Sequence, residues 1–172
     1  MSPQARKLEA HSSKLTLSMK TKELITTFYE AMKVRDYKTM ASLYAINALF
    51  SDPVFPSLSG SEAGKMWEML LKGAKDMEVE YKILDHGKDR AKVRWVARYT
   101  FSRTGRKVRN EVVSTFELLD GQILTQRDRF NFRKWSRQAL GFLPWLLGFT
   151  GVTQKKVQET AERGLNDFIR KN

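Results

Sequence analysis

The feature that most constrains the fold is a change of hydrophobic period near Ala74. Before it, apolar residues recur at helical spacing, as in the run from Thr21 to Met32. After it they alternate, so that along residues 91–102 one face is apolar and the other is mostly basic or polar. A strand with one apolar face needs a second layer to cover that face. The chain is therefore predicted to be α+β, with helices packed on one face of a sheet.

Turn sequences divide the alternating half into strands. RTGR, which begins at Arg103, and the dipeptide formed by Asp120 and Gly121 are typical of hairpin turns. They predict strands at about 77–84, 91–102, 107–119 and 122–132, after a brief strand at about 48–50. Consecutive hairpins give a mainly antiparallel meander, which we expect to curve strongly and to enclose a pocket beneath the helices.

Helix signals lie on both sides of these strands. SGSE, which begins at Ser59, matches a capping box and predicts a helix start. The first helix is expected to begin near Met19, and a basic amphipathic helix closes the chain. We therefore expect a flexible polar tail at 1–18, a domain at 19–135, and an apolar segment with the last helix at 136–172, packed on the same domain.

The residue types present exclude several kinds of chemistry. The chain has no cysteine, so disulfides, thiolate catalysis and cysteine–metal sites are excluded. His11 and His86 are the only histidines, and their separation disfavours a catalytic histidine or a histidine metal site. We expect no metal or other cofactor. The N-terminus lacks the apolar core of a signal peptide, which favours a cytoplasmic protein.

The segment LFSDPVFP places Asp52 between Phe50 and Phe55. Two interpretations stay open. Asp52 can be an ordinary turn residue that accepts backbone N–H bonds before Pro53. Alternatively, it lies in an apolar cavity that changes its pKa, as catalytic carboxyl groups often do.

Asp128 is a second candidate. Alternation along the last strand places Leu124, Gln126, Asp128, Phe130 and Phe132 on the face opposite the polar residues, which points Asp128 inward. It can be a hydrogen-bonded structural group, a catalytic or ligand-binding group, or simply exposed. Tyr99 and Trp95 on a neighbouring strand are possible partners for its carboxyl group.

A set of aromatic residues is predicted to face the same interior. They can line a pocket for a planar or polycyclic ligand, or they can fill the core. The set comprises Phe28, Trp67, Trp95, Tyr99, Phe116 and Phe130.

Several longer segments carry a family resemblance: SLYAINALFSDPVF, SGSEAGKMWEML, FELLDGQI and RDRFNFRKWSRQALG. Together they resemble the SnoaL-like and ketosteroid-isomerase-like branch of the nuclear transport factor 2 superfamily, over about residues 20–135. The resemblance implies a cone in which N-terminal helices pack on a curved sheet, here with extra C-terminal helices. This fold hosts isomerases, cyclases, epoxide hydrolases, dehydratases and non-catalytic binders.

The resemblance to ketosteroid isomerase places Asp52 at the position of the general base. The oxyanion-hole tyrosine of that enzyme corresponds to Phe28, which has no hydroxyl, and Tyr29 should point about 100° away on the helix. The protonated aspartate corresponds to Ser114, a weaker donor that would still contact a ligand. Losing one oxyanion donor typically lowers the rate by about a hundredfold to a thousandfold. Ketosteroid isomerase activity is therefore not expected.

The resemblance to limonene-epoxide hydrolase matches Asp128 in QRDRFNF. That group also needs an arginine and a second aspartate on an earlier strand, where this chain has Ala97 and Tyr99. Epoxide hydrolysis by that mechanism is not expected either.

The net charge of +12 at pH 7 favours anionic partners. Seven cationic residues cluster on two predicted strands and their turn: Lys92, Arg94, Arg98, Arg103, Arg106, Lys107 and Arg109. No RNA-binding aromatic signature or helix-turn-helix pattern accompanies them, so nucleic acid is not expected as a partner. A solvated sheet face or a homodimer surface fits this pattern better.

Residues 139–152 are almost entirely apolar but too short to span a bilayer. They can form a lid over the cavity or a partner contact, or they can dip into an anionic membrane surface. From the sequence we predict a SnoaL-like protein that binds a small hydrophobic molecule in an apolar cavity. If it is catalytic, it is an isomerase, cyclase or hydratase-type enzyme that uses Asp52 or Asp128 as acid or base. The alternative is a non-catalytic adaptor that uses the basic, apolar C-terminal surface.

Overall fold

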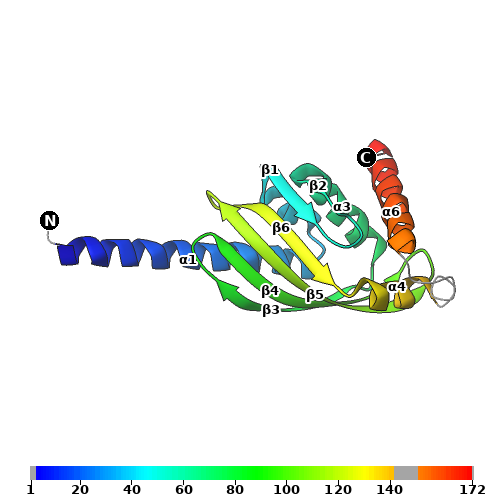
Figure 1. The fold of residues 1–172 in the computed structure, drawn as a ribbon, viewed down its shortest axis with the longest axis horizontal. Helices are drawn as coiled ribbons and strands as arrows, with labels where there is room; N and C mark the ends of the chain where they lie inside the picture. Colours follow the sequence, from blue (N-terminus) through cyan, green and yellow to red (C-terminus); the bar gives the residue numbers. More distant parts are fainter. Residues whose placement is uncertain (1–2, 142–150, 172) are drawn as a thin grey trace.

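The computed structural model describes residues 3–141 and 151–171 as a curved six-stranded sheet with helices on its concave side (Figure 1). The elements are α1 (Pro3–Lys33), α2 (Tyr37–Ser42), β1 (Tyr44–Ser51), β2 (Leu58–Ser59), α3 (Gly60–Gly73), β3 (Glu78–His86), β4 (Arg90–Phe101), β5 (Arg106–Leu119), β6 (Gln122–Phe130), α4 (Phe132–Leu140) and α6 (Gly151–Lys171). The predicted α+β architecture is confirmed.

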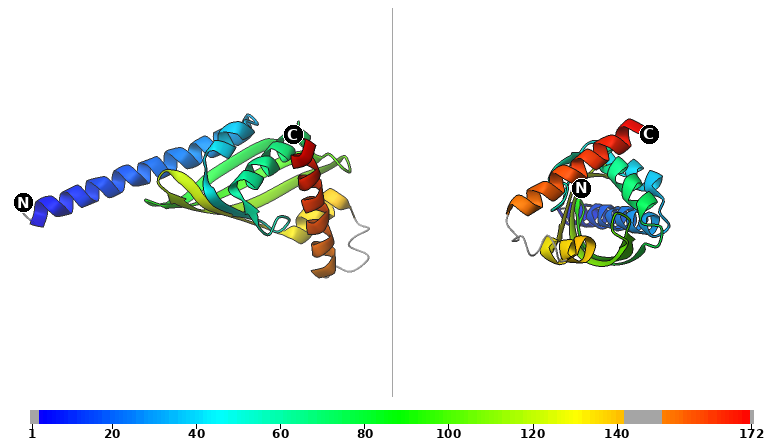
Figure 2. Two further views of the ribbon diagram at one scale, coloured as in Figure 1. Left: turned by 90° about the horizontal axis from the view of Figure 1, so that it is seen from above. Right: turned by 90° about the vertical axis from the view of Figure 1, so that its right-hand side faces the viewer.

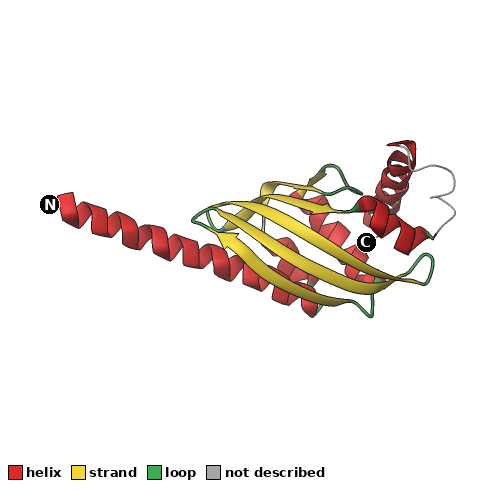
Figure 3. Ribbon diagram, turned by 60° about the horizontal axis from the view of Figure 1, so that its bottom comes forward, coloured by secondary structure: helices red, strands yellow, loops and turns green. Residues whose placement is uncertain are grey.

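The strand order across the sheet is β2-β1-β6-β5-β4-β3. The last four strands form the predicted antiparallel meander, and β1 lies parallel to β6. Figure 3 shows the strands running over the helices that they cover. Because β1 and β6 run in the same direction, the carboxyl ends of these two strands lie together.

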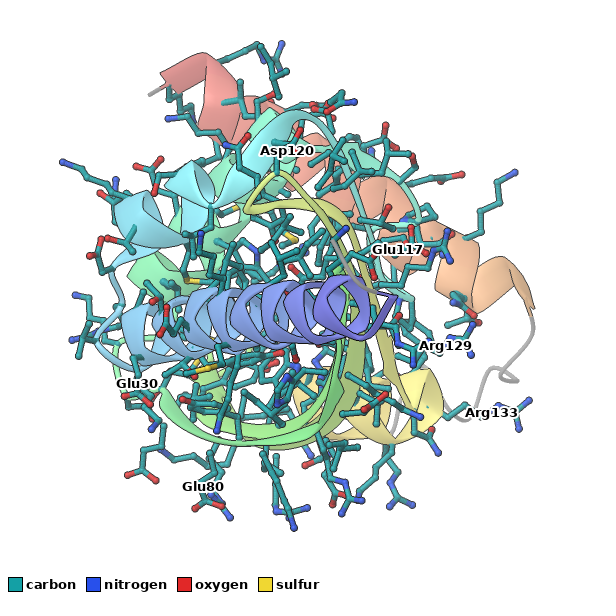
Figure 4. The ribbon with its side chains drawn as sticks, turned by 90° about the vertical axis from the view of Figure 1, so that its left-hand side faces the viewer. Glu30, Glu80, Glu117, Asp120, Arg129 and Arg133 are labelled. Atoms are coloured by element: carbon teal, nitrogen blue, oxygen red, sulfur yellow. The ribbon has the colours of Figure 1, made fainter. Side chains whose placement is uncertain are left out.

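The core lies between the helices and the concave face of the sheet. Figure 4 views the molecule from its N-terminal side, with α1 across the centre, the sheet curving round it, and Glu80 and Arg129 projecting outward. The largest side chains that are fully buried come from both layers: Tyr29, Phe28, Phe50, Phe116, Ile25, Met32, Met40, Met66 and Ile123. The alternating pattern of β4 is confirmed, since Val93, Trp95 and Ala97 are buried.

Local signals set the ends of two helices. Glu62 N–H donates to Ser59 Oγ at 3.4 Å, and Ser59 N–H donates to Glu62 Oε2 at 2.8 Å, which confirms the capping box of α3. The Asn131 side chain accepts the N–H of Lys134 and caps α4. This cap explains why β6 ends at Phe130 instead of continuing to residue 132.

Two elements begin earlier than predicted. Helix α1 starts at Pro3 instead of Met19 and projects beyond the sheet (Figures 1 and 2). Proline is well suited to a first helical turn, and the polar residues after it include good helix formers. The helix therefore extends over a segment that has no apolar pattern. Strand β1 starts at Tyr44 instead of residue 48 because it pairs with β6 at that residue.

The predicted inward position of Leu124 is wrong. The pairing of β5 with β6 shifts between Glu117 and Leu118, and Ile123 is fully buried. Leu124 is only partly buried. A bulge adds one residue to a strand and so reverses the alternation on one side of it. Gln126 and Asp128 keep the predicted inward position.

Helices α4 and α6 lie at the end of the molecule opposite the N-terminus (Figures 1 and 2). The apolar run predicted to be a lid or a membrane contact lies mostly outside the described residues, which omit 142–150. Within 3–141 and 151–171, no helix is long and apolar enough to cross a membrane.

Candidate functional site

The two candidate carboxyl groups meet at the carboxyl ends of β1 and β6. Phe50 and Gln126 are register partners across these parallel strands, and both are buried. Asp52, which directly follows the last residue of β1, and Asp128 on β6 each come two residues later, and alternation turns them toward the same face. Neighbouring strands lie about 4.8 Å apart. The fold therefore brings together two aspartates that are far apart in the sequence.

Asp52 is held by its own loop. Its Oδ1 accepts the N–H groups of Val54 at 2.6 Å and Phe55 at 2.5 Å, as the turn interpretation expects. No described residue donates a hydrogen bond to Oδ2, and the residue is partly exposed. Burial raises the pKa of Asp52 to about 6, and the bonds from Phe55 and Val54 oppose this rise. Asp52 thus accepts the backbone bonds that the turn interpretation expects, and it also has a raised pKa.

Asp128 is held by side chains instead. It is 5% exposed, and the Gln126 amide donates to its Oδ1 at 3.0 Å. Burial raises the pKa of Asp128 to about 7, hydrogen bonds from Ser114 and Gln126 lower it, and the charge of Asp52 raises it. The charge of Asp52 therefore influences the ionisation of Asp128.

Ser114 connects Asp128 to the aromatic core. Its Oγ accepts a hydrogen bond from Trp95 Nε1 at 2.8 Å and another from the Tyr29 hydroxyl at 3.1 Å. Burial, followed by the charge of Asp128, raises the pKa of Tyr29 well above its usual value. The Tyr29 hydroxyl therefore stays protonated, and it donates its hydrogen bond to Ser114.

Gln126 extends the network in the other direction. Its Oε1 accepts from the Tyr44 hydroxyl at 2.5 Å, and the Tyr44 oxygen accepts from Trp67 Nε1 at 2.9 Å. Among the described residues, every buried side-chain nitrogen and oxygen has a hydrogen-bond partner. A buried network in which every polar group is hydrogen-bonded favours one arrangement of the core.

The predicted ligand-binding residues separate into two groups. Trp67, Trp95 and Ser114 belong to the buried network, and the Phe28 ring packs edge-on against Trp67 at 5.9 Å between centroids. Tyr99 and Phe130 lie at the α4 end of the site. There the Trp135 indole donates to the Tyr99 hydroxyl at 2.9 Å, and its ring lies 6.2 Å from that of Phe130.

Sequence reasoning missed three members of the network. It expected Tyr29 to point away from the position of Phe28, but both are fully buried because α1 buries a broad face. The sequence placed Gln126 inward but gave the residue no role, although Gln126 lies two residues before Asp128. It included Tyr44 in the segment SLYAINALFSDPVF and gave it no role. The β1–β6 pairing that joins Tyr44 to Gln126 spans 82 residues of chain and left no local signal.

The direct partners proposed for Asp128 were Tyr99 and Trp95. The structure connects Trp95 to Asp128 only through Ser114, and it bonds Tyr99 to Trp135. Neither residue is therefore hydrogen-bonded to Asp128 directly.

Other possible sites are few in the described part of the chain. No group of three or more histidine, aspartate or glutamate residues is placed there to hold a metal ion. One surface hollow of about 520 Å³ is lined by Arg106, Lys107, Arg137 and Gln138. Another, of about 560 Å³, lies between α2, β1 and α3. Neither hollow is lined by Asp52 or Asp128.

Comparison with known proteins finds a family and a fold. The model of the SnoaL-like domain matches residues 25–126. An epoxide hydrolase from M. tuberculosis that resembles limonene-epoxide hydrolase is 17% identical, with a TM-score of 0.58 over 76% of this chain and 97% of that one. A proposed polyketide cyclase from Xanthomonas campestris is also 17% identical, with a TM-score of 0.60 over 72% and 98%.

A phenazine biosynthesis-related protein from Pseudomonas aeruginosa is 16% identical, with a TM-score of 0.62 over 76% of this chain and 91% of that one. No curated protein matches the chain. Sequence identities this low, together with these TM-scores, show a shared fold, but they do not show a shared activity.

Proposed function

We propose a function from one premise: the chain belongs to the SnoaL-like family, whose model matches residues 25–126. We infer that the protein binds a small hydrophobic molecule at the carboxyl ends of β1 and β6 and moves a proton on it. Asp52 is the group that exchanges the proton with the ligand, and no metal or organic cofactor takes part. Proteins of this fold include a proposed polyketide cyclase and an epoxide hydrolase, which supports a ligand of this class.

The observation that carries the proposal is the adjacent pair of carboxyl groups with pKa values raised to about 6 for Asp52 and about 7 for Asp128. An acid or base works best when its pKa lies near the working pH. Neighbouring carboxyl groups also disfavour double ionisation, so the pair carries about one negative charge near neutral pH. Asp128 then holds a proton while Asp52 is free to accept one.

The geometry supports different roles for the two groups. Asp52 keeps Oδ1 fixed on two backbone N–H groups, while Oδ2 is available to a ligand. Oδ2 would take a proton from a carbon next to a carbonyl, and the electron pair of the broken C–H bond would move onto the carbonyl oxygen. The proton would then return to another atom of the ligand. Asp128 is enclosed, and we assign it the role of setting the charge beside Asp52.

Deuterium exchange tests this proposal. The protein would be incubated in D₂O with a panel of hydrophobic ketones, and mass spectrometry would follow deuterium entering the position next to the carbonyl. We expect Asp52→Asn to slow exchange by about a hundredfold or more. Asp85→Asn, at an exposed position on β3, is the matched control and should leave the rate unchanged.

Two results would refute the proposal. One is exchange at the wild-type rate in Asp52→Asn. The other is no exchange with any ketone together with no bound small molecule in native mass spectra of the wild-type protein. We also propose that the chain forms a homodimer, and the same spectra would report its oligomeric state.

A second candidate function is supported by the surface of α4. Its buried side consists of Phe132, Trp135, Ser136 and Ala139, while Arg133, Lys134 and Arg137 are exposed. Such a basic face can bind an anionic membrane surface without any reaction. Sedimentation with vesicles of anionic lipid at low and high salt would test this. Binding that disappears with high salt supports the adaptor, and a lack of binding at low salt removes it.

A further inference from the structure

Two glutamines of α6 contact the loop that holds Asp52. Gln154 Nε2 and Gln158 Nε2 donate to the same carbonyl oxygen, that of Pro53, at 3.1 Å and 3.0 Å. The two residues are four apart and so lie on one face of the helix. A carbonyl oxygen has two lone pairs, and both are engaged here.

The peptide group that accepts these bonds is also a donor to Asp52. The carbonyl of Pro53 and the N–H of Val54 belong to one peptide unit, and this N–H donates to Asp52 Oδ1 at 2.6 Å. Hydrogen bonds therefore run from the glutamine amides through one peptide group to the carboxylate. Bonds in such a chain polarise one another, so donors on the carbonyl make the N–H a stronger donor.

We propose that Gln154 and Gln158 are positioning residues for Asp52. They fix the loop so that Oδ2 faces the ligand, and they strengthen the bond that stabilises the carboxylate. The inference rests on the proposed function only where it names Asp52 as the proton-transfer group. The hydrogen-bonded chain itself does not depend on any reaction.

Helix α6 is anchored independently of these two contacts. Leu165 is 2% exposed and belongs to the core, and the Lys72 ammonium of α3 lies 5.6 Å from the centre of the Phe168 ring. The family match ends at residue 126, so α6 is an addition to the matched domain. This chain thus carries an element, outside the matched region, that reaches its candidate site.

Replacing the two glutamines of α6 does not change the charged groups around Asp52. The described groups that are influenced by the charge of Asp52 are Asp128 on β6 and Tyr99 on β4, and neither is altered by changing α6. On α6 the neighbouring Lys155 and Glu159 are exposed. Removing two neutral glutamines therefore tests hydrogen bonding and not net charge.

The experiment is a titration of the Asp52 carboxyl group by carbon-13 NMR in the full chain. Methionine has the length of glutamine but no N–H, so the test variant is Gln154→Met with Gln158→Met. We expect the pKa of Asp52 to rise by about half a pH unit and the Val54 amide proton to move upfield. Each single variant should give a smaller change, and these remain measurable if the double variant does not fold.

Asn166→Met is the matched control, because Asn166 is uncharged and exposed on the same helix. It should change neither signal. An unchanged Asp52 pKa and Val54 shift in the glutamine variants would overturn the inference, whatever happens to the melting temperature. Failure of the ketone exchange would instead remove the proposed function and leave this inference standing.

Discussion

Asp52 and Asp128 lie at the carboxyl ends of two paired strands, but the molecule holds them in different ways. Within the matched domain, Asp52 is bonded by backbone groups two and three residues away. Asp128 is bonded by side chains that lead through Ser114 to α1 and β4, and through Gln126 to β1 and α3. The first arrangement is local, and the second requires most of the fold to be in place.

The difference suggests a division of labour between the two groups. A loop carboxyl that is partly exposed, with one oxygen to which no described residue donates a hydrogen bond, can contact a ligand. A carboxyl enclosed by satisfied partners is better suited to setting the charge nearby, and it couples the site to the stability of the core. Changes at the two positions should therefore have different consequences.

The largest expected effect on stability comes from replacing the enclosed group. Asp128→Leu should lower the free energy of unfolding by about 4 kcal/mol, because the buried Ser114 and Gln126 donors lose their acceptor. Asp52→Asn keeps an oxygen that can accept both backbone N–H bonds, and it should cost less than about 1 kcal/mol. Urea unfolding at pH 7 would measure both. Equal losses would show that the two groups are held in the same way.

The pH dependence of stability should show an effect of similar size for each of the two groups. The folded pKa values of about 6 and about 7 lie above the unfolded value of about 4, so the folded state binds these protons more tightly. The resulting stability is complete below pH 4 and is lost as pH rises through 6 and 7, about 3 kcal/mol for Asp52 and about 4 kcal/mol for Asp128.

Thermal unfolding in buffers of different pH would measure this loss of stability. Comparison with Asp128→Asn would show how much of the loss comes from Asp128. In that variant the loss should end near pH 6 because only Asp52 still titrates. A wild-type protein that becomes more stable between pH 4 and pH 8 would contradict the assignment.

The smallest expected loss of stability comes from Tyr44, at the end of the hydrogen-bond network that is far from Asp128. Tyr44→Phe should cost about 2 kcal/mol, because it leaves Trp67 Nε1 without an acceptor and Gln126 without a donor. Tyr81→Phe is the control, since the Tyr81 hydroxyl bonds to Glu30 on the surface at 2.8 Å, and it should cost less than about 0.5 kcal/mol. Equal costs would mean that the network does not act as a buried unit.

The same contrast explains what the sequence could predict. The capping box at Ser59, the alternation along β4 and the inward position of Asp128 depend on neighbours within a few residues, and all are present. The backbone bonds to Asp52 were also expected as one alternative. These features are local, so their physical causes can be read directly from short segments.

The features that were missed depend on distant partners or on irregular pairing. Tyr29 acquires its role from Ser114, which is 85 residues away, and Leu124 lost its inward position through a bulge. The contacts of Gln154 and Gln158 with Pro53 span more than 100 residues. Hydrophobic periodicity assigns a face to each residue, but it does not pair residues across elements.

The most direct test of the account is the titration of Asp128 by carbon-13 NMR in the wild-type protein and in Asp52→Asn. We predict that Asp128 titrates near pH 7 in the wild type and at a lower pH in the variant, because the charge of Asp52 raises its pKa. If Asp128 titrates near pH 4 in both proteins, the two carboxyl groups do not form one site tuned by burial and by each other.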